Sequence, residues 1–261
     1  MKIKMYQVDA FAGSLFTGNP ACVCLLHEEW LADELMQKIA MENNVAETAF
    51  IINKNNEYHI RWFTPEVEVD LCGHATLASG HVLFNHENFK GELISFQSKS
   101  GKLSVRKDDE YLTLNFPEDS LQKMDAREEL SACFDQQPVE TLKGKTDYML
   151  VFENEDQIRD IRCDFAKVSA IEARGIIVTA RGRDVDFVSR FFAPQSGIAE
   201  DPVTGSAHTT LVPYWRNVLG KDNLTAAQLS ERGGFLKCRY VDGRIEISGK
   251  ALTYLSGEIV V

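Results

Sequence analysis

The sequence lacks any pair of cysteines in a CxxC motif, although it contains six cysteines. No histidine-rich segment accompanies them at the spacing of zinc ligands. These absences argue against a structural zinc site and predict free thiols in a reducing compartment. Cys22 and Cys24 are two residues apart in an apolar strand pattern, so we expect both on one strand face as small buried residues.

Long apolar runs are also missing. No segment approaches the roughly 20 apolar residues that a membrane-spanning helix needs. The opening segment MKIKMYQVDAF alternates polar and apolar residues as a strand does, and it lacks the apolar core and cleavage site of a signal peptide. The sequence therefore predicts a cytoplasmic protein without a membrane partner.

Positive charge is scarce. The chain has 28 Lys and Arg residues against 39 Asp and Glu, a net charge of -11 at pH 7, which argues against a nucleic-acid partner. Neither a dinucleotide-binding glycine fingerprint nor a Walker loop is present. We expect no nicotinamide, flavin, pyridoxal phosphate or metal cofactor. Hydrophobic residues make up 44% and charged residues 26%, as in an ordinary globular protein with a core.

An internal repeat organises the sequence. The spacing between matched segments grows slowly from 129 to 133 residues, as duplication followed by small loop insertions would leave. One match could arise by chance, but four in order predict two similar halves. The matches are Lys38-Ile39-Ala40 with Lys167-Val168-Ser169, FTP from Phe63 with FAP from Phe192, and the segments from Gly73 and Gly101 with those from Gly205 and Gly234.

Each half is predicted to be a mostly antiparallel sheet with one buried helix, an α+β fold. Alternating apolar residues at 112, 114 and 116 and at 245 and 247 are typical of strands, and Asp242-Gly243 is a strong hairpin turn. Residues 73–84 are apolar on nearly every side, which predicts a helix buried on all faces. Its counterpart after Gly205 carries Pro213, which should kink or end that helix. The polar segment of about residues 117–146 suits a surface helix and a connector between the halves.

Positions at which the two halves differ are candidates for chemistry at a shared site. Glu47 corresponds to Ile176, so a carboxylate begins the apolar strand TAFII in only one half. Apolar surroundings destabilise a carboxylate and should raise the pKa of Glu47 from about 4.3 toward the ~6–7 that suits a general base. A surface glutamate at the end of a strand is the simpler alternative.

His74 corresponds to Ser206, and each follows a glycine that opens a helix. Helix N-termini present unpaired N–H groups and partial positive charge to an anion. If the halves face one cleft, these ends would stabilise a substrate carboxylate or the charge that develops during proton abstraction, and His74 would donate or relay a proton. Alternatively, His74 is a satisfied buried histidine and Ser206 caps its helix.

Asp201 precedes the second helix in the segment EDPVTGSA. It could serve as a second carboxylate opposite Glu47 or could orient His74 through a hydrogen bond. As an acid near a helix N-terminus, it needs no catalytic role. The other histidines show no ligand spacing, and none is assigned to a metal.

Cys72 raises the possibility of a racemase. A thiol just before a helix N-terminus would have a lowered pKa and could act as a base. Racemases that use two opposed thiols need one in each half, but Cys72 corresponds to Thr204. One thiol cannot carry out a symmetric racemisation.

Four long segments, VDAFAGSLFTGNPACVCLL, NNVAETAFI, RWFTPEVEVDLCGHATLASGHVLF and RFFAPQSGIAEDPVTGSAHTTLVPYW, closely resemble the phenazine-biosynthesis PhzF-like family. With GGFLKCRY and the closing strand, the resemblance touches most of the chain. It implies the diaminopimelate-epimerase-like fold, in which the C-terminal strand returns to the first domain. The expected domains are therefore residues 1–117, joined by about residues 250–261, and residues 118–249.

The resemblance also implies an activity and a site. The family's best-understood member isomerises trans-2,3-dihydro-3-hydroxyanthranilate, using a glutamate to abstract a ring proton and return it to another carbon. By resemblance, Glu47 is that acid and base, and His74, Asp201 and Ser206 match the other active-site positions. The substrate pocket would be lined by Gly18, Asn19, Pro20, Gly73 and Gly205.

We therefore expect a cofactor-independent isomerase that moves a proton on a small carboxylate by acid/base catalysis, and the resemblance makes a homodimer the expected assembly. Two alternatives stay open. One is an amino-acid racemase or epimerase that uses Glu47 and Cys72 as unlike bases. The other is a protein that binds a small molecule without catalysis.

Overall fold

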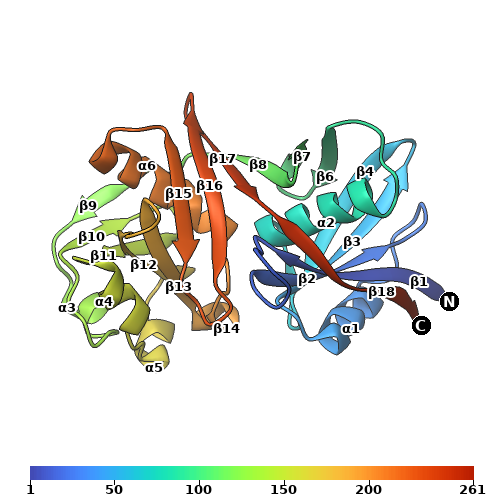
Figure 1. Cartoon of the computed structure of the whole chain (residues 1–261). Coiled ribbons are helices and arrows are strands. Elements are labelled where there is room, and N and C mark those ends of the chain that lie inside the picture. The colour runs from blue at the N-terminus through green and yellow to red at the C-terminus, as the bar shows by residue number, and fades with distance from the viewer. The chain divides into compact units, whose positions relative to one another are not determined.

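The chain divides into two compact units. The computed structural model describes the backbone of residues 1–261 and every side chain except that of residue 196. The first unit comprises Met1–Asn115 and Ser248–Val261, and the second comprises Phe116–Ile247. Figure 1 shows the course of the chain, with β18 returning beside β1 so that both termini belong to the first unit.

The first unit is a mixed sheet in which most neighbours are antiparallel. The pairing runs from β18 through β1, β2, β3 and β4, and continues from β4 through β6, β7 and β8. Only the pairs β2–β3 and β4–β6 are parallel. The elements are β1 (Lys2–Ala10), β2 (Asn19–Leu25), α1 (Asp33–Asn43), β3 (Glu47–Lys54), β4 (Glu57–Phe63), β5 (Glu68–Val69), α2 (Gly73–Asn85), β6 (Leu93–Ser98), β7 (Gly101–Asp108), β8 (Tyr111–Pro117) and β18 (Ala251–Val260).

The second unit repeats this pairing order. It runs from β9 through β10, β11, β12 and β13, and continues from β13 through β15 and β16. Its parallel pairs, β11–β12 and β13–β15, fall at the equivalent places. The expected α+β class, with a mostly antiparallel sheet in each half, is confirmed. The elements are β9 (Gln122–Met124), α3 (Glu128–Ser131), β10 (Glu140–Lys143), β11 (Asp147–Val151), α4 (Glu155–Asp160), α5 (Phe165–Ser169), β12 (Gly175–Arg181), β13 (Phe187–Ala193), η1 (Pro194–Ser196), β14 (Ile198–Glu200), η2 (Gly205–Ala207), α6 (His208–Leu219), β15 (Asn223–Gln228), β16 (Gly234–Val241) and β17 (Arg244–Gly249).

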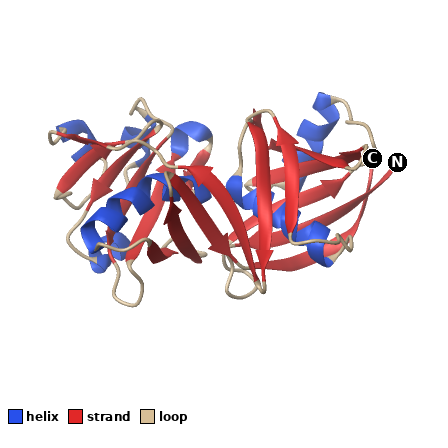
Figure 2. Cartoon of the chain, turned by 90° about the horizontal axis from the view of Figure 1, so that it is seen from above, coloured by secondary structure: helices blue, strands red, loops and turns tan.

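Helix α2 is the buried helix of the first unit, as the apolar pattern predicts. Ten of its 13 residues are buried, so no face is left to solvent along its length. It lies against β1, β2, β3 and β7. Figure 2 shows the helices, in blue, beside the strands, in red. Helix α1 covers the other face of the sheet, where Met36 and Ile39 pack on Phe50. The sheet therefore packs against α2 along its buried length.

Gly80 sets how closely α2 approaches β7. A Cβ atom at Gly80 would lie 2.7 Å from Cγ1 of Val105. Gly80→Ala is therefore expected to lower the free energy of unfolding by about 1–3 kcal/mol, although alanine is the better helix former. Urea unfolding measures this change, with Gly257→Ala as control because nothing lies within 4 Å of its Cβ position. Adding Val105→Ala should restore much of the loss, and a Gly80→Ala protein of full stability would show that α2 can move away from β7.

Helix α6 passes through Pro213 and ends at Leu219, so of the two effects expected of Pro213, a kink or the end of the helix, the second does not occur. Pro213 cannot donate to the carbonyl of Thr209. The backbone N–H of Asp119 donates to that carbonyl instead, at 3.1 Å, and Thr210 Oγ1 donates to the Asp119 carboxylate. A partner distant in sequence thus replaces the missing helical hydrogen bond.

The segment of residues 117–146 holds less helix than expected. Its only helix, α3, has four residues, and β9 and β10 pair on either side of it. The hairpin turn is confirmed, because Asp242 and Gly243 both have positive φ, 47° and 75°, between β16 and β17. None of the described helices is long and apolar enough to cross a membrane.

Candidate functional site

Glu47 owes its position to the way α1 ends. Asn44 closes the helix in the left-handed conformation, with φ of 49°, and its N–H donates to the carbonyl of Ala40. The chain then turns, and Glu47 becomes the first residue of β3, opposite Ala21 of the parallel strand β2. Its side chain is only 12% exposed.

His74 lies in the first turn of α2 and faces Glu47. Its side chain is 6% exposed, and its Nε2 lies 3.1 Å from Oε2 of Glu47. At the other ring nitrogen, Asn19 Nδ2 lies 3.3 Å and Cys72 Sγ 3.5 Å from Nδ1. An Asn19 N–H that donates to Nδ1 leaves the proton of the neutral ring on Nε2, the nitrogen that faces the carboxylate.

The two facing atoms are buried without hydrogen-bond partners. Oε2 of Glu47 and Nε2 of His74 have no partner among the described residues, although they lie close together. Their distance is short but their alignment does not make a hydrogen bond. Leaving a buried polar atom unpaired costs about 1–3 kcal/mol, and such atoms gather where a ligand or water completes the structure.

Charge at this site is set by burial and by neighbours. Burial by itself would lower the pKa of His74, but its contacts with Cys72 and Glu47 outweigh burial and hold that pKa well above its ordinary value. Burial, followed by the Glu47 carboxylate, raises the pKa of the Cys72 thiol. This direction is opposite to the one expected for a thiol before a helix N-terminus, because burial dominates.

Gly18 and Pro20 frame Asn19 where the chain enters β2. Gly18 has φ of 73°, and a Cβ there would lie 2.3 Å from the carbonyl oxygen of Ala10, so only glycine fits. Pro20 pairs with Asp9 in the ladder between β1 and β2. In the first unit, the structure thus brings Asn19, Glu47 and His74 together, with Gly18 and Gly73 in the backbone that positions them.

In the second unit, Asp201 lies in a network that fixes its carboxylate. Thr204 Oγ1 donates to Asp201 Oδ2 at 2.6 Å. The buried Gln228 binds both ends of the segment, because its Nε2 donates to the carbonyl of Asp201 and its Oε1 accepts from the N–H of Thr204. Gly205 and Ser206 follow directly in η2, which leads into α6. The predicted residues of this half therefore lie around one helix start.

The chain matches the family model described as phenazine biosynthesis-like protein, PhzC-PhzF, over residues 8–257. It belongs to this family. A Pseudomonas aeruginosa protein named as an uncharacterized isomerase is 51% identical over 260 residues, which cover 99% of this chain and 99% of that protein. The crystal structure of a PhzF-family phenazine biosynthesis protein from Enterococcus faecalis has a TM-score of 0.97 and 45% identity, with 100% of both chains covered.

The epimerase-like fold is confirmed by a more distant structure. A hydroxyproline epimerase from Agrobacterium vitis has a TM-score of 0.64, covers 99% of this chain and 92% of its own, and shares only 9% identity, so the likeness concerns the fold alone. The predicted membership of the PhzF-like family is confirmed, and its relatives confirm the enzyme class as isomerase.

Sequence reasoning missed Arg174. This PhzF-like chain places Arg174 directly before β12, where its Nη1 donates to Ser206 Oγ at 2.8 Å and its Nε donates to the buried Asp147 at 2.8 Å. Burial by itself would lower the pKa of Arg174, but its hydrogen bond to Asp147 and the charges of Asp147, Asp201 and Asp119 outweigh burial and raise that pKa. The repeat could have identified it. Arg174 corresponds to Val45, which lies two positions before Glu47, so the second half has a charged residue where the first half has an apolar one.

His208 provides a pH test of the second unit of this PhzF-like protein. It is fully buried, its Nδ1 lies 3.0 Å from the carbonyl of Thr204, and burial lowers its pKa to about 4. The unfolded chain, with a pKa near 6.5, therefore binds more protons, so stability should fall by about 3 kcal/mol as pH drops from 6.5 to 4. Urea unfolding across this range should give a flatter pH curve for His208→Gln than for wild type, and the exposed control His27→Gln should keep the wild-type slope. Equal slopes for His208→Gln and wild type would contradict the prediction.

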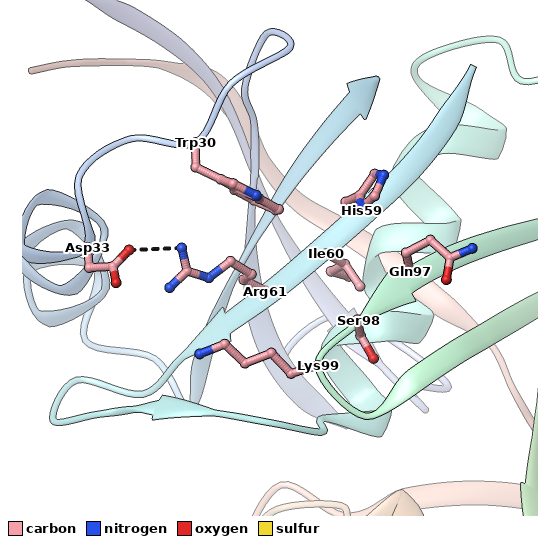
Figure 3. Close-up of a pocket in the computed structure, with 8 residues that line it drawn as sticks. All are labelled: Trp30, Asp33, His59, Ile60, Arg61, Gln97, Ser98 and Lys99. Atoms are coloured by element: carbon pink, nitrogen blue, oxygen red, sulfur yellow. Dashed lines mark hydrogen bonds and ion pairs between the residues drawn. The ribbon is translucent and has the colours of Figure 1, made fainter. Parts of the chain in front are cut away.

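A separate pocket on the first unit holds none of the predicted site residues. It has a volume of about 500 Å³ and is lined by side chains that include Trp30, Arg61 and Lys99. Its cations are already paired, because Arg61 contacts Asp33 at 2.9 Å, as Figure 3 shows, and both Arg61 and Lys99 contact Glu68. This pocket therefore offers no unpaired charge to a ligand.

Proposed function

We propose that the protein is a cofactor-independent isomerase that moves a proton on a small carboxylate substrate, with Glu47 as acid and base. One observation carries the proposal. Oε2 of Glu47 and Nε2 of His74 are buried 3.1 Å apart, and neither has a hydrogen-bond partner among the described residues. A substrate between or beside them would supply what each lacks, a proton for the carboxylate and an acceptor for the ring N–H.

The proton transfer needs no oxidant or reductant. The Glu47 carboxylate accepts a proton from a substrate carbon, and the electron pair of that C–H bond enters an adjacent π system. The ring N–H of His74 donates to the oxygen on which negative charge develops. Glu47, now a carboxylic acid, returns the proton to another carbon, so a double bond moves and the atoms balance.

A single acid and base favours isomerisation over inversion. The proton returns on the face from which it left, whereas inversion at one carbon needs an acid on the opposite face. Cys72 would have to be that acid in the racemase alternative. It contacts His74 at Nδ1, whereas Glu47 faces Nε2, and burial raises the pKa of its thiol, which makes the thiol a poor proton donor.

We further propose that Asp201 and Ser206 act on the same substrate. Support comes from the local order of these side chains, since Thr204 donates to Asp201 and Arg174 donates to Ser206. The Ser206 hydroxyl at a helix start is suited to hydrogen-bonding a substrate carboxylate, whereas the Asp201 carboxylate is suited to accepting a hydrogen bond from a substrate hydroxyl or amino group. Substituting Asp201 by Asn or Ser206 by Ala in the assay below tests this part separately.

The test is deuterium uptake from D2O into a panel of carboxylates, measured by mass spectrometry. The panel contains dihydro-hydroxyanthranilate-like compounds and amino acids, and NMR of any labelled product locates the deuterium. Uptake on a second carbon supports isomerisation, and uptake with inversion at the original carbon supports the racemase. Binding of a panel member without any uptake would support the non-catalytic alternative and overturn the proposal.

A further inference from the structure

One side chain beside the proton-transfer pair has no part in the mechanism above. Cys72 Sγ lies 3.5 Å from Nδ1 of His74, whereas Glu47 faces the other ring nitrogen, Nε2. Glu47, Cys72 and His74 each offer one potential ligand atom, and these three atoms lie within 4.8 Å of one another. A carboxylate oxygen, a thiolate sulfur and an imidazole nitrogen are the donor types of protein zinc sites.

We propose that Glu47, Cys72 and His74 form a site for Zn²⁺, and that an ion bound there inhibits the enzyme. The proposed zinc is an inhibitor and not a cofactor. Among the described residues, no other group of His, Cys, Asp and Glu has this spacing. Cys72, which has no part in the proton transfer, thus belongs to a set of three metal-donor residues.

The distances suit a tetrahedral ion. Two ligands bound to zinc at about 2.0 and 2.3 Å and separated by the tetrahedral angle lie roughly 3.5 Å apart. Cys72 Sγ and His74 Nδ1 already have this separation, at 3.5 Å. The carboxylate of Glu47 completes the set by rotation of its side chain toward the same point. Three protein ligands leave the fourth position of the ion to water.

The charges also suit a divalent ion. Binding replaces the thiol proton of Cys72 and any second proton on the His74 ring, so protons are released to solvent as the ion binds. The resulting thiolate and the Glu47 carboxylate together balance the two positive charges of Zn²⁺. A buried ion is tolerated when it is paired in this way and coordinated. Binding is therefore expected to strengthen with rising pH.

Zinc would inhibit the enzyme because Glu47 belongs both to the proposed metal site and to the proposed proton-transfer pair. The carboxylate of Glu47 cannot accept a substrate proton while it coordinates a cation, and His74 loses its position beside it. Zn²⁺ would thus compete directly with proton transfer. This last step rests on the proposed function, whereas metal binding itself does not.

Cobalt serves as the spectroscopic probe for the site. Titration of the metal-free, reduced protein with Co²⁺ should produce a thiolate-to-cobalt charge-transfer band in the near ultraviolet that saturates at one ion per chain. Added Zn²⁺ should remove the band by displacement. Cys72→Ala should abolish the band, and the matched control Cys238→Ala, another buried free cysteine, should retain it.

A second variant keeps the test decisive if Cys72→Ala does not fold. His74→Gln keeps the thiol but should weaken Co²⁺ binding by at least about 100-fold. A band that survives in Cys72→Ala, or wild type that binds no stoichiometric Co²⁺, overturns the proposal. Wild type that takes up deuterium but binds no Co²⁺ overturns the metal site alone, whereas binding without any deuterium uptake counts against the proposed function alone.

Discussion

Glu47→Gln is expected to lower the rate of deuterium uptake by about 10²–10⁴-fold, the range that a positioned general base contributes. Glutamine has the size of glutamate and can occupy the same place beside His74, but its amide does not accept a proton from carbon. The loss should appear in the maximal rate, because the substrate still meets the same surface. Mass spectrometry of the labelled substrate, with both proteins at equal concentration, measures it.

The matched control for this experiment is Glu42→Gln. Glu42 lies on helix α1, close to Glu47 in sequence but exposed, so its substitution removes the same charge from the chain without touching the site. It should keep the wild-type rate. Uptake by Glu47→Gln at the wild-type rate would remove Glu47 from the mechanism and transfer the role of base to His74 or Cys72.

The buried helix, the sheet order of the second unit and the position of Glu47 could be predicted from local residue patterns and from the internal repeat. The apolar segment after Gly73 predicts the buried helix α2, and its duplication predicts the same sheet order in the second unit. The contrast of Glu47 with Ile176 identifies the residue that faces His74. Each of these inferences needs only periodicity or the comparison of one half with the other.

The missing part consists of contacts between residues far apart in sequence. Asn19 reaches the ring of His74 because β2 lies beside β3 and under the start of α2, a relation that no periodicity reveals. The same is true of Arg174 with Ser206. Pro213 shows the limit most clearly, because its effect on α6 depends on Asp119 satisfying a carbonyl that the local sequence leaves unpaired.

Phe50→Ala is expected to lower the free energy of unfolding of the first unit by about 3–5 kcal/mol, the usual cost of removing a buried phenylalanine ring. Phe50 is fully buried in β3, three residues after Glu47, and its ring meets that of Phe63 edge to face at 5.5 Å. It belongs to the cluster through which α1 packs on the sheet. The cavity left by the ring would therefore weaken the packing of α1 and β3, the two elements joined by the turn that leads to Glu47.

Tryptophan fluorescence during urea unfolding measures this loss in the right unit. Trp30 and Trp62 belong to the first unit and Trp215 to the second, so a Trp215→Phe background reports the first unit alone. Phe50→Leu, which keeps most of the volume, should cost less than about 1.5 kcal/mol in the same background. Deuterium uptake by the folded fraction of Phe50→Ala is the second measurement. A wild-type rate per folded molecule would mean that the core supports Glu47 only by keeping the first unit folded. A lower rate per folded molecule would instead mean that packing behind β3 holds the carboxylate of Glu47 in its reactive position beside His74.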